Sequence, residues 1–249
     1  ADAKLKPVDV VGVGTGVAGS IMCIELANAG LKVVGLERGR LLDPQHDFVM
    51  PYVHDELKYD RHSDIFQNLS RETITFRNTL NETALPMREL GSFKPGDCVG
   101  GTAAHWGCHA KRFLPWDFEM RSRTIARYGK NQIPEDCTSQ DWGLTYDELE
   151  PYYDQFEHIY GIGGKAGNLN GEIQPGGNPF EGPRSREFPN PPTDRSFIGS
   201  LFAKAAGSFG YKPYQNATAA MTRPYTNSYR LMLGQCMHSG FCSSHGCLC

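Results

Sequence analysis

Four of the eight cysteines lie close together near the end of the sequence, in the pattern Cys236-x5-Cys242-x4-Cys247-x-Cys249. Thiolates at such short spacing can hold an iron–sulfur cluster or a structural zinc ion, or can pair as a disulfide. The stretch lacks the paired C-x-x-C of the usual zinc ribbon, and it contains the glycines that allow backbone N–H groups to reach cluster sulfurs. Spacing alone leaves these three chemistries open.

A second set of residues with chemical meaning lies near the start, where Gly14, Gly16 and Gly19 form the pattern G-x-G-x-x-G. Glycines at this spacing permit a tight turn and let a backbone approach a pyrophosphate closely. Glu37 follows 18 residues after Gly19 and can accept hydrogen bonds from both hydroxyl groups of a ribose. These residues predict a site for a dinucleotide cofactor, and at this point they do not separate NAD from FAD.

The elements around these residues are the ones that would position them. An apolar, valine-rich run over residues 8–13 is typical of a buried parallel strand, and residues 20–29 have helical spacing before Gly30, which can end a helix. A second strand over residues 31–37 ends on Glu37. Strand, glycine turn, helix, strand and acid in this order predict a Rossmann-like α/β fold, whose helix N-terminus offers N–H groups to phosphate.

Residues 91–118 contain a second stretch rich in glycine and small residues, "GSFKPGDCVGGTAAHWGCHAKRFLPWDF". Gly100 and Gly101 would let the backbone lie along an extended cofactor, and the imidazole of His105 would follow just beyond them. Taken alone, His105 is more typical of a core or capping histidine than of a flavin neighbour.

The later part of the chain is read more coarsely. Thr145 and Glu148 have the spacing of a capping box at the start of a helix, and Pro151 is expected to open a second helical stretch. Glycine and proline are frequent over residues 161–192, which predicts an irregular excursion of the kind that covers a site or meets a partner. Residues 196–210 predict an amphipathic helix with a structural role.

Composition excludes several classes of function. The chain has 249 residues, 39% of them hydrophobic and 21% charged, and a formal charge of -3, so it can bury a core and has no basic run suited to nucleic acid. No apolar run reaches the roughly 18 residues that a membrane-spanning helix needs, so membrane contact is expected only through a partner. Eight cysteines are too few for a disulfide scaffold and leave the compartment open.

Four segments together, "GVGTGVAGS", "LERG", "VGGTAAHWGCHAKRFLPWDF" and "LTYDELEPYYDQFEHIYGIGG", resemble the glucose-methanol-choline family of flavin oxidoreductases, over nearly the whole chain. The resemblance is greatest to the FAD subunits of membrane-associated members that oxidise sugars and sugar acids such as gluconate. It implies that FAD is the cofactor and that His105 matches a histidine that carries covalent flavin in some members, with "AHW" here in place of "THW". The implied contacts are with the ADP half for Gly14, Gly16, Gly19 and Glu37, and with the flavin end for Gly100, Gly101 and Thr102.

The resemblance also bears on the cysteines. Sugar dehydrogenases of this group carry a Cys-rich segment at a comparable place, and this implies a three-iron (3Fe-4S) cluster held by Cys236, Cys242 and Cys247, with Cys249 the least supported. A flavin receives two electrons with a hydride whereas a cytochrome takes one at a time, so a cluster between them would resolve the mismatch. The implied partners are a small subunit and a cytochrome c subunit at the periplasmic face of the bacterial inner membrane, while a cytoplasmic location stays open.

Members of this family are much longer, and their catalytic histidine lies towards the C-terminus, beyond the position of residue 249. The resemblance therefore implies that the general base is not in this chain. It predicts an N-terminal fragment or incomplete gene product, with segments of an FAD-binding domain over residues 1–135 and the start of an α+β substrate domain over 136–249. Two alternatives are a non-catalytic nucleotide-binding fragment and an NAD(P)-dependent reductase.

Overall fold

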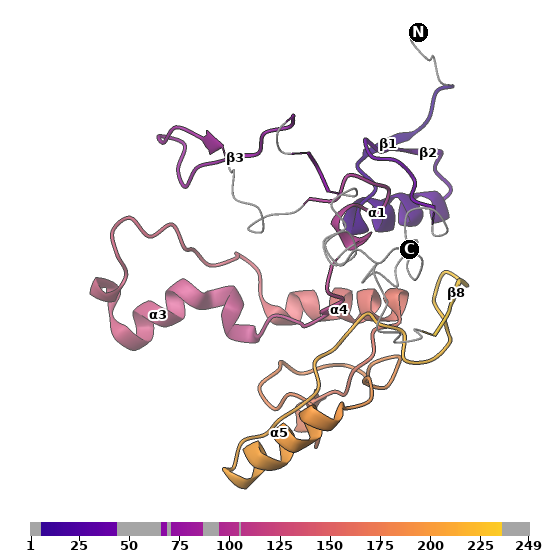
Figure 1. Cartoon of the computed structure of the whole chain (residues 1–249). Helices are drawn as coiled ribbons and strands as arrows, with labels where there is room; N and C mark the ends of the chain where they lie inside the picture. Colours follow the sequence, from indigo (N-terminus) through magenta and orange to yellow (C-terminus); the bar gives the residue numbers. More distant parts are fainter. Residues whose placement is uncertain (1–5, 44–65, 69–70, 87–94, 105, 236–249) are drawn as a thin grey trace, which may run out of the picture. The chain divides into compact units, whose positions relative to one another are not determined.

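A computed structural model describes residues 6–43, 66–68, 71–86, 95–104 and 106–235 of the chain. The described residues mix helices and short strands, which is compatible with the predicted α/β class. They divide into two compact units, the first within residues 1–107 and the second within residues 108–237 (Figure 1). Each unit is described by itself.

The first unit is built on a strand, a helix and a second strand. β1 (Val10–Val13) and β2 (Val33–Leu36) pair in parallel, with Val10 opposite Val33, and α1 (Val17–Asn28) connects them and lies against both (Figure 1). The three predicted elements are thereby confirmed. Gly30 has φ of +90°, the left-handed conformation expected after the helix.

The helix begins three residues earlier than predicted, at Val17 instead of Ser20. The glycine pattern had placed Gly19 in the turn, but in the structure Gly19 is already helical. A Cβ atom there would lie 2.1 Å from the carbonyl oxygen of Gly14, so the missing side chain is what lets the first helical turn approach the loop.

The rest of the first unit is less regular. The remaining elements are an antiparallel pair formed by β3 (Thr75–Phe76) and β4 (Leu85–Pro86), and the 3-10 helix η2 (Gly101–Ala104). The parallel pair leaves large apolar side chains in solvent, among them Val13 at 85% exposure. Parallel sheets are normally covered on both faces, whereas in the described residues α1 is the element that covers β1 and β2.

The second unit contains α4 (Tyr146–Tyr160), whose start confirms the predicted capping box. The Thr145 hydroxyl accepts from the Glu148 nitrogen, and a Glu148 oxygen accepts from the Thr145 nitrogen at 2.7 Å. The prediction that Pro151 opens a second helical stretch is wrong, because α4 runs through Pro151 without interruption. Pro151 lies early in the helix, and the cap and the buried polar contacts of later residues hold the helix together despite its missing N–H group.

The other elements of this unit are short. They are η3 (Pro115–Glu119), α3 (Met120–Tyr128), η4 (Lys130–Gln132), the antiparallel pairs β5 (Asn168–Leu169) with β6 (Glu172–Ile173) and β7 (Tyr225–Thr226) with β8 (Met232–Leu233), and α5 (Phe197–Ser208).

The glycine-rich excursion over residues 161–192 is mainly irregular, as predicted, but it also forms much of the core of the second unit. Ile162 and Ala166 are fully buried in it. A Cβ on Gly167 would lie 2.0 Å from a backbone oxygen of Asn178, and one on Gly182 would lie 2.4 Å from the ring of Tyr146. Its glycines therefore serve close packing of backbone, which composition alone does not distinguish from a loose loop.

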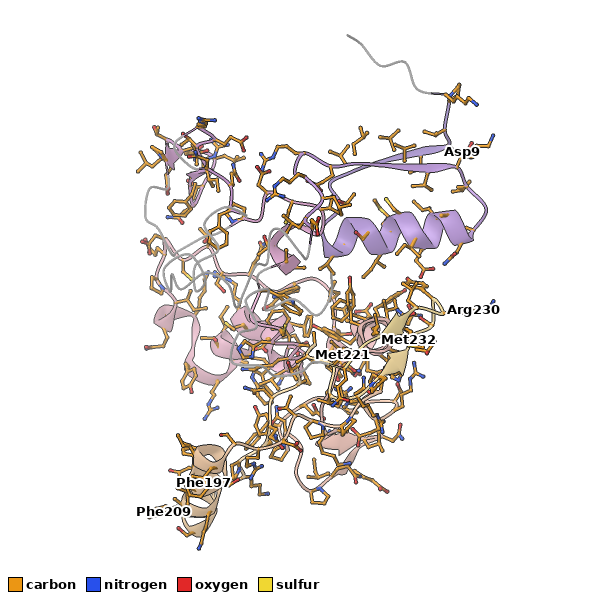
Figure 2. All side chains as sticks on the ribbon, turned by 45° about the vertical axis from the view of Figure 1, so that its right-hand side comes forward. Asp9, Phe197, Phe209, Met221, Arg230 and Met232 are labelled. Atoms are coloured by element: carbon orange, nitrogen blue, oxygen red, sulfur yellow. The ribbon has the colours of Figure 1, made fainter. Side chains whose placement is uncertain are left out.

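The predicted helix over residues 196–210 is present as α5, with Ser196 as its N-cap. Its apolar side chains are exposed among the described residues, Phe202 at 68%, and Figure 2 shows Phe197 and Phe209 at its two ends. Met221, also labelled in Figure 2, is by contrast buried. Among the described residues, no helix has the length and apolarity that crossing a membrane would require.

Candidate dinucleotide site

The glycine loop between β1 and α1 adopts a conformation that its sequence makes possible. Gly14 has φ of +87°, a region that L side chains rarely adopt, and its nitrogen donates to the carbonyl oxygen of Leu36 at 2.7 Å. This bond continues the β1–β2 pairing into the loop. Gly14 and Gly19 are therefore both required, the first for its φ angle and the second for close approach.

The N-terminus of α1 has no side-chain cap among the described residues. Gly16 is the N-cap, and no described side chain accepts a hydrogen bond from the first turn there. The amide groups of this turn and the positive end of the helix dipole lie beside a loop that has no side chain at its glycine positions. Such an arrangement suits a phosphate or pyrophosphate group.

Glu37 follows β2 and is bound by its own chain through both carboxylate oxygens. Oε2 accepts from the Thr15 nitrogen at 2.7 Å and from the Thr15 hydroxyl at 2.9 Å, while Oε1 accepts from the nitrogens of Arg38 at 2.8 Å and Gly39 at 3.0 Å. The backbone N–H groups of Gly39 and Thr15 lower the pKa of Glu37 from 4.5 to about 2. The carboxylate is thus ionised and joins the glycine loop to the segment after β2.

The second glycine stretch lies directly against the first. The Gly100 nitrogen donates to the carbonyl oxygen of Thr15 at 3.1 Å, and Gly16 and Gly100 form an isolated parallel bridge. Gly100 and Gly101 have φ of +93° and +59°, and a Cβ on Gly101 would lie 3.5 Å from the Cα of Gly16. The structure therefore brings together two predicted groups of cofactor residues that are far apart in the sequence.

A second contact reinforces this arrangement. The Val99 nitrogen donates to the carbonyl oxygen of Arg40 at 3.0 Å, and a Cβ on Gly39 would lie 2.2 Å from the nitrogen of Cys98, which is fully buried. Sequence reasoning did not single out Thr15, Gly39 or Cys98. The glycine in "LERG" was the available signal for close approach, but its neighbour Cys98 could not be identified without the fold.

The remaining predicted site residues have different outcomes. The Thr102 hydroxyl accepts from the nitrogen of Gly96 at 3.3 Å, so it closes the second glycine stretch on itself. His105 lies outside the described residues. The same holds for Cys236, Cys242, Cys247 and Cys249. Within the described part of the chain, no group of three His, Cys, Asp or Glu side chains could hold a metal.

The described residues fit the diphosphate part of a dinucleotide, which would contact the protein backbone. Two glycine segments meet beside a helix N-terminus, and an ionised carboxylate lies at the end of the adjoining strand. This arrangement can bind and orient an extended diphosphate. Glu37 would have to share its oxygens between a ribose and the donors that already occupy them, so its predicted contact with a ribose stays a prediction.

Comparison with known proteins places the chain beside three curated relatives. It is 44% identical over 247 residues to a gluconate 2-dehydrogenase flavoprotein of Pantoea cypripedii. This match covers 98% of this chain and 40% of the length of the relative. Matches at 27% identity, each covering 87% of this chain, are a 2-methyl-1,2-propanediol dehydrogenase of Mycolicibacterium austroafricanum and a fructose dehydrogenase large subunit of Gluconobacter japonicus. The chain spans 34% and 37% of these two. No family model matches the chain.

Proposed function

Since this chain belongs to the glucose-methanol-choline type of FAD subunit, we propose that it is part of an FAD-dependent dehydrogenase that oxidises a hydroxyl group of a sugar or sugar acid. The observation that carries this proposal is the contact between the two glycine segments at Thr15, Gly16 and Gly100. This contact supports one continuous binding surface, called the cradle below, that is formed by residues 14–19 and 100–102 and is long enough for both halves of an extended cofactor. The 44% identity to a gluconate 2-dehydrogenase flavoprotein favours a gluconate-type substrate.

The proposed binding mode assigns each described residue a part. Gly14, Gly16 and Gly19 leave room for the pyrophosphate at the N-terminus of α1, and Glu37 orients both the glycine loop and the adenosine ribose. Gly100, Gly101 and Thr102 would lie along the flavin end. We extend this to a Rossmann-like FAD-binding domain with segments over residues 1–135 and a substrate domain beginning over 136–249. When bound, the flavin supplies the hydride acceptor.

The proposal extends to electron transfer. Cys236, Cys242 and Cys247 are the residues we expect to ligate a three-iron cluster, with a small subunit and a cytochrome c as partners at the periplasmic face of the membrane. The support is the cysteine spacing, the family resemblance, and the fact that one relative is named a large subunit. Iron and acid-labile sulfide in the purified full-length protein would support this part. Zinc or a disulfide at these cysteines would contradict the cluster proposal and would leave the proposal of FAD binding standing.

The general base is expected in the part of the longer proteins that this chain does not include. The chain spans about two fifths of the length of the gluconate 2-dehydrogenase flavoprotein, and none of its histidines matches the family's catalytic histidine. We therefore assign the described residues to binding and orientation of the cofactor, and no proton transfer to any of them.

The experiment that tests FAD binding compares two glycines of the full-length protein with similar backbone conformation. Gly100 has φ of +93° and Gly171, in the turn between β5 and β6, has φ of +90°, and an added Cβ would meet no atom of the described residues within 4 Å at either. Gly100→Ala should lose most of its FAD and its bleaching by gluconate, while Gly171→Ala should keep both. Equal flavin content in the two variants would contradict the proposed cradle. A wild-type protein that uses NAD(P) without flavin would identify a reductase instead, and flavin that gluconate does not bleach would favour a binding fragment.

A further inference from the structure

Helix α5 of the second unit has a side that is strongly apolar and uncovered among the described residues. None of the helix residues is buried. Its large apolar side chains, with the one that follows its last residue, are between 53% and 80% exposed: Leu201, Phe202, Phe197, Ile198 and Phe209. Phe197 and Phe209 mark the two ends of the helix in Figure 2. Among the described residues, no other helix or strand forms an extended contact with α5.

These five side chains, called the apolar face of α5 below, lie on one side of the helix. At 3.6 residues per turn they fall within an arc of about 140°. The opposite side carries Gly199, Ala203 and Ala206, which are half-buried. An amphipathic helix normally turns its large apolar residues inward, whereas α5 contacts its own unit through small residues and leaves the large ones in solvent.

A helix of this composition needs a covering partner. α5 has 12 residues, a length at which an isolated helix is only marginally stable in water. It also contains Gly199 and Gly207, and glycine is unfavourable inside a helix. The Ser196 cap supports its first turn only. Most of the stability of α5 must therefore come from packing of its apolar face.

The size of this face shows how much cover is missing. Its three phenylalanines alone expose on the order of 400 Å², since an aromatic side chain has roughly 150–250 Å² to bury. The largest apolar patch on a typical monomer is about 300–600 Å². The face is thus too large to be an ordinary piece of protein surface.

Charge and area favour cover from the same polypeptide. A helix that lies on a membrane has a polar side rich in lysine and arginine, whereas Lys204 is the one charged residue of α5. The face of one helix also falls short of the roughly 800 Å² per partner that a stable interface between two proteins buries. Contact within one polypeptide avoids the entropy cost of association, so a smaller face is sufficient.

The comparison with relatives shows that such cover is available. The match to the gluconate 2-dehydrogenase flavoprotein includes 98% of this chain but 40% of that protein, so more than half of the longer protein lies outside this chain. We propose that the apolar face of α5 is an internal docking surface, covered in the full-length protein by an apolar segment from the portion outside this chain. The inference does not depend on the proposed cofactor or activity.

Photochemical cross-linking of the full-length flavoprotein subunit, purified without other subunits, tests the occupant directly. The photoreactive residue p-benzoylphenylalanine replaces Phe209, at the edge of the face, where a larger ring is easier to accommodate. Irradiation should give a product with the mass of a single chain. Mass spectrometry should place the cross-link on a residue outside the 249 described by this sequence. A cross-link within these 249 residues, to a second copy or to lipid would overturn the proposal.

Thiol labelling gives an independent measurement with a matched control on the same helix. Phe202→Cys places a thiol within the apolar face, whereas Ser200→Cys places one at an exposed position outside it. Because a covered thiol reacts only when the structure opens locally, the first variant should be labelled at least about tenfold more slowly at its new site. Equal labelling of the two sites in folded protein would show that the face stays in solvent. If Phe202→Cys does not fold, the cross-link at Phe209 decides.

Discussion

The carboxylate of Glu37 accepts a hydrogen bond from the backbone nitrogen of Thr15 at 2.7 Å, which joins the end of β2 to the glycine loop that follows β1. The same side chain holds the nitrogen of Gly39 at 3.0 Å, and Gly39 packs on Cys98 of the second glycine stretch. One acid thus orders three segments of the cradle. An acid at the end of the second strand is usually considered for its contact with ribose, but here it also shapes the protein that surrounds the cofactor.

Glu37→Gln is expected to weaken both folding and FAD binding in the full-length protein. The amide replaces one acceptor oxygen by a donor that faces backbone N–H groups, so at least one pair of hydrogen bonds is lost. Bonds to a charged acceptor contribute roughly 1.5–3 kcal/mol, and we expect a loss of that order in the free energy of unfolding. Flavin content and denaturant unfolding measure the two effects.

A control for this substitution is available in the same unit. Glu72 makes an exposed ion pair with Arg38 at 2.6 Å, and pairs of this kind contribute about 1 kcal/mol or less. Glu72→Gln should leave flavin content intact. If Glu37→Gln is no more damaging than Glu72→Gln, Glu37 does not organise the cradle.

The contribution of Glu37 should also depend on pH. Because folding lowers its pKa from 4.5 to about 2, the stabilisation is fully present above pH 4.5 and is lost as the pH falls through 2. The difference in unfolding free energy between the wild type and Glu37→Gln should therefore shrink over this interval. A difference that stays constant from neutral pH down to the lower end would show that ionisation of Glu37 does not contribute.

His105 is expected to lie beside the flavin and to be bonded to it. Acid-denatured full-length protein should then keep its yellow colour, and His105→Ala should release the flavin. His109→Ala, a nearby control on an exposed histidine, should behave as the wild type does. Complete release of free flavin from the denatured wild type would rule out the bond while leaving proximity open.

Local sequence signals predicted the β1–α1–β2 order, the left-handed Gly30 and the capping box of Thr145, because each depends on neighbours a few residues apart. The contact of Gly16 with Gly100 also depends on the path of the intervening chain, which no local pattern specifies. Sequence did predict the two glycine stretches as parts of one cofactor site, but only through resemblance to a family.

The polar core of the second unit was not predicted. Glu157 is one of several acids in the sequence of α4, yet its side chain is 3% exposed and contacts two arginines. One partner, Arg184, lies in the glycine-rich excursion, whose composition predicted an irregular segment and gave no sign of burial. Charged residues at helical spacing do not reveal whether they face water or a cation from another segment.

Arg112 and Glu157 form a two-point ion pair in this core, with both N–O distances at 2.9 Å and each side chain 3% exposed. Burial by itself would lower the pKa of Arg112, but the hydrogen bonds and charge of Glu157 more than offset this effect and raise it. Arg112 therefore stays charged, and it also pairs with Glu150 at 3.0 Å. Removal of one member of a buried pair leaves an uncompensated charge, which costs roughly 3–5 kcal/mol.

Glu157→Gln should consequently destabilise the full-length protein by about that amount, because it leaves Arg112 paired with Glu150 alone and Arg184 with no carboxylate closer than that of Glu181 at 3.8 Å. The control is Glu119→Gln, which breaks an exposed pair with Arg123 one helical turn apart and should change the free energy of unfolding by about 0.5 kcal/mol or less. Denaturant unfolding of both variants gives the comparison. A loss at Glu157 no larger than that at Glu119 would mean that water or another acid reaches the arginines in the whole protein.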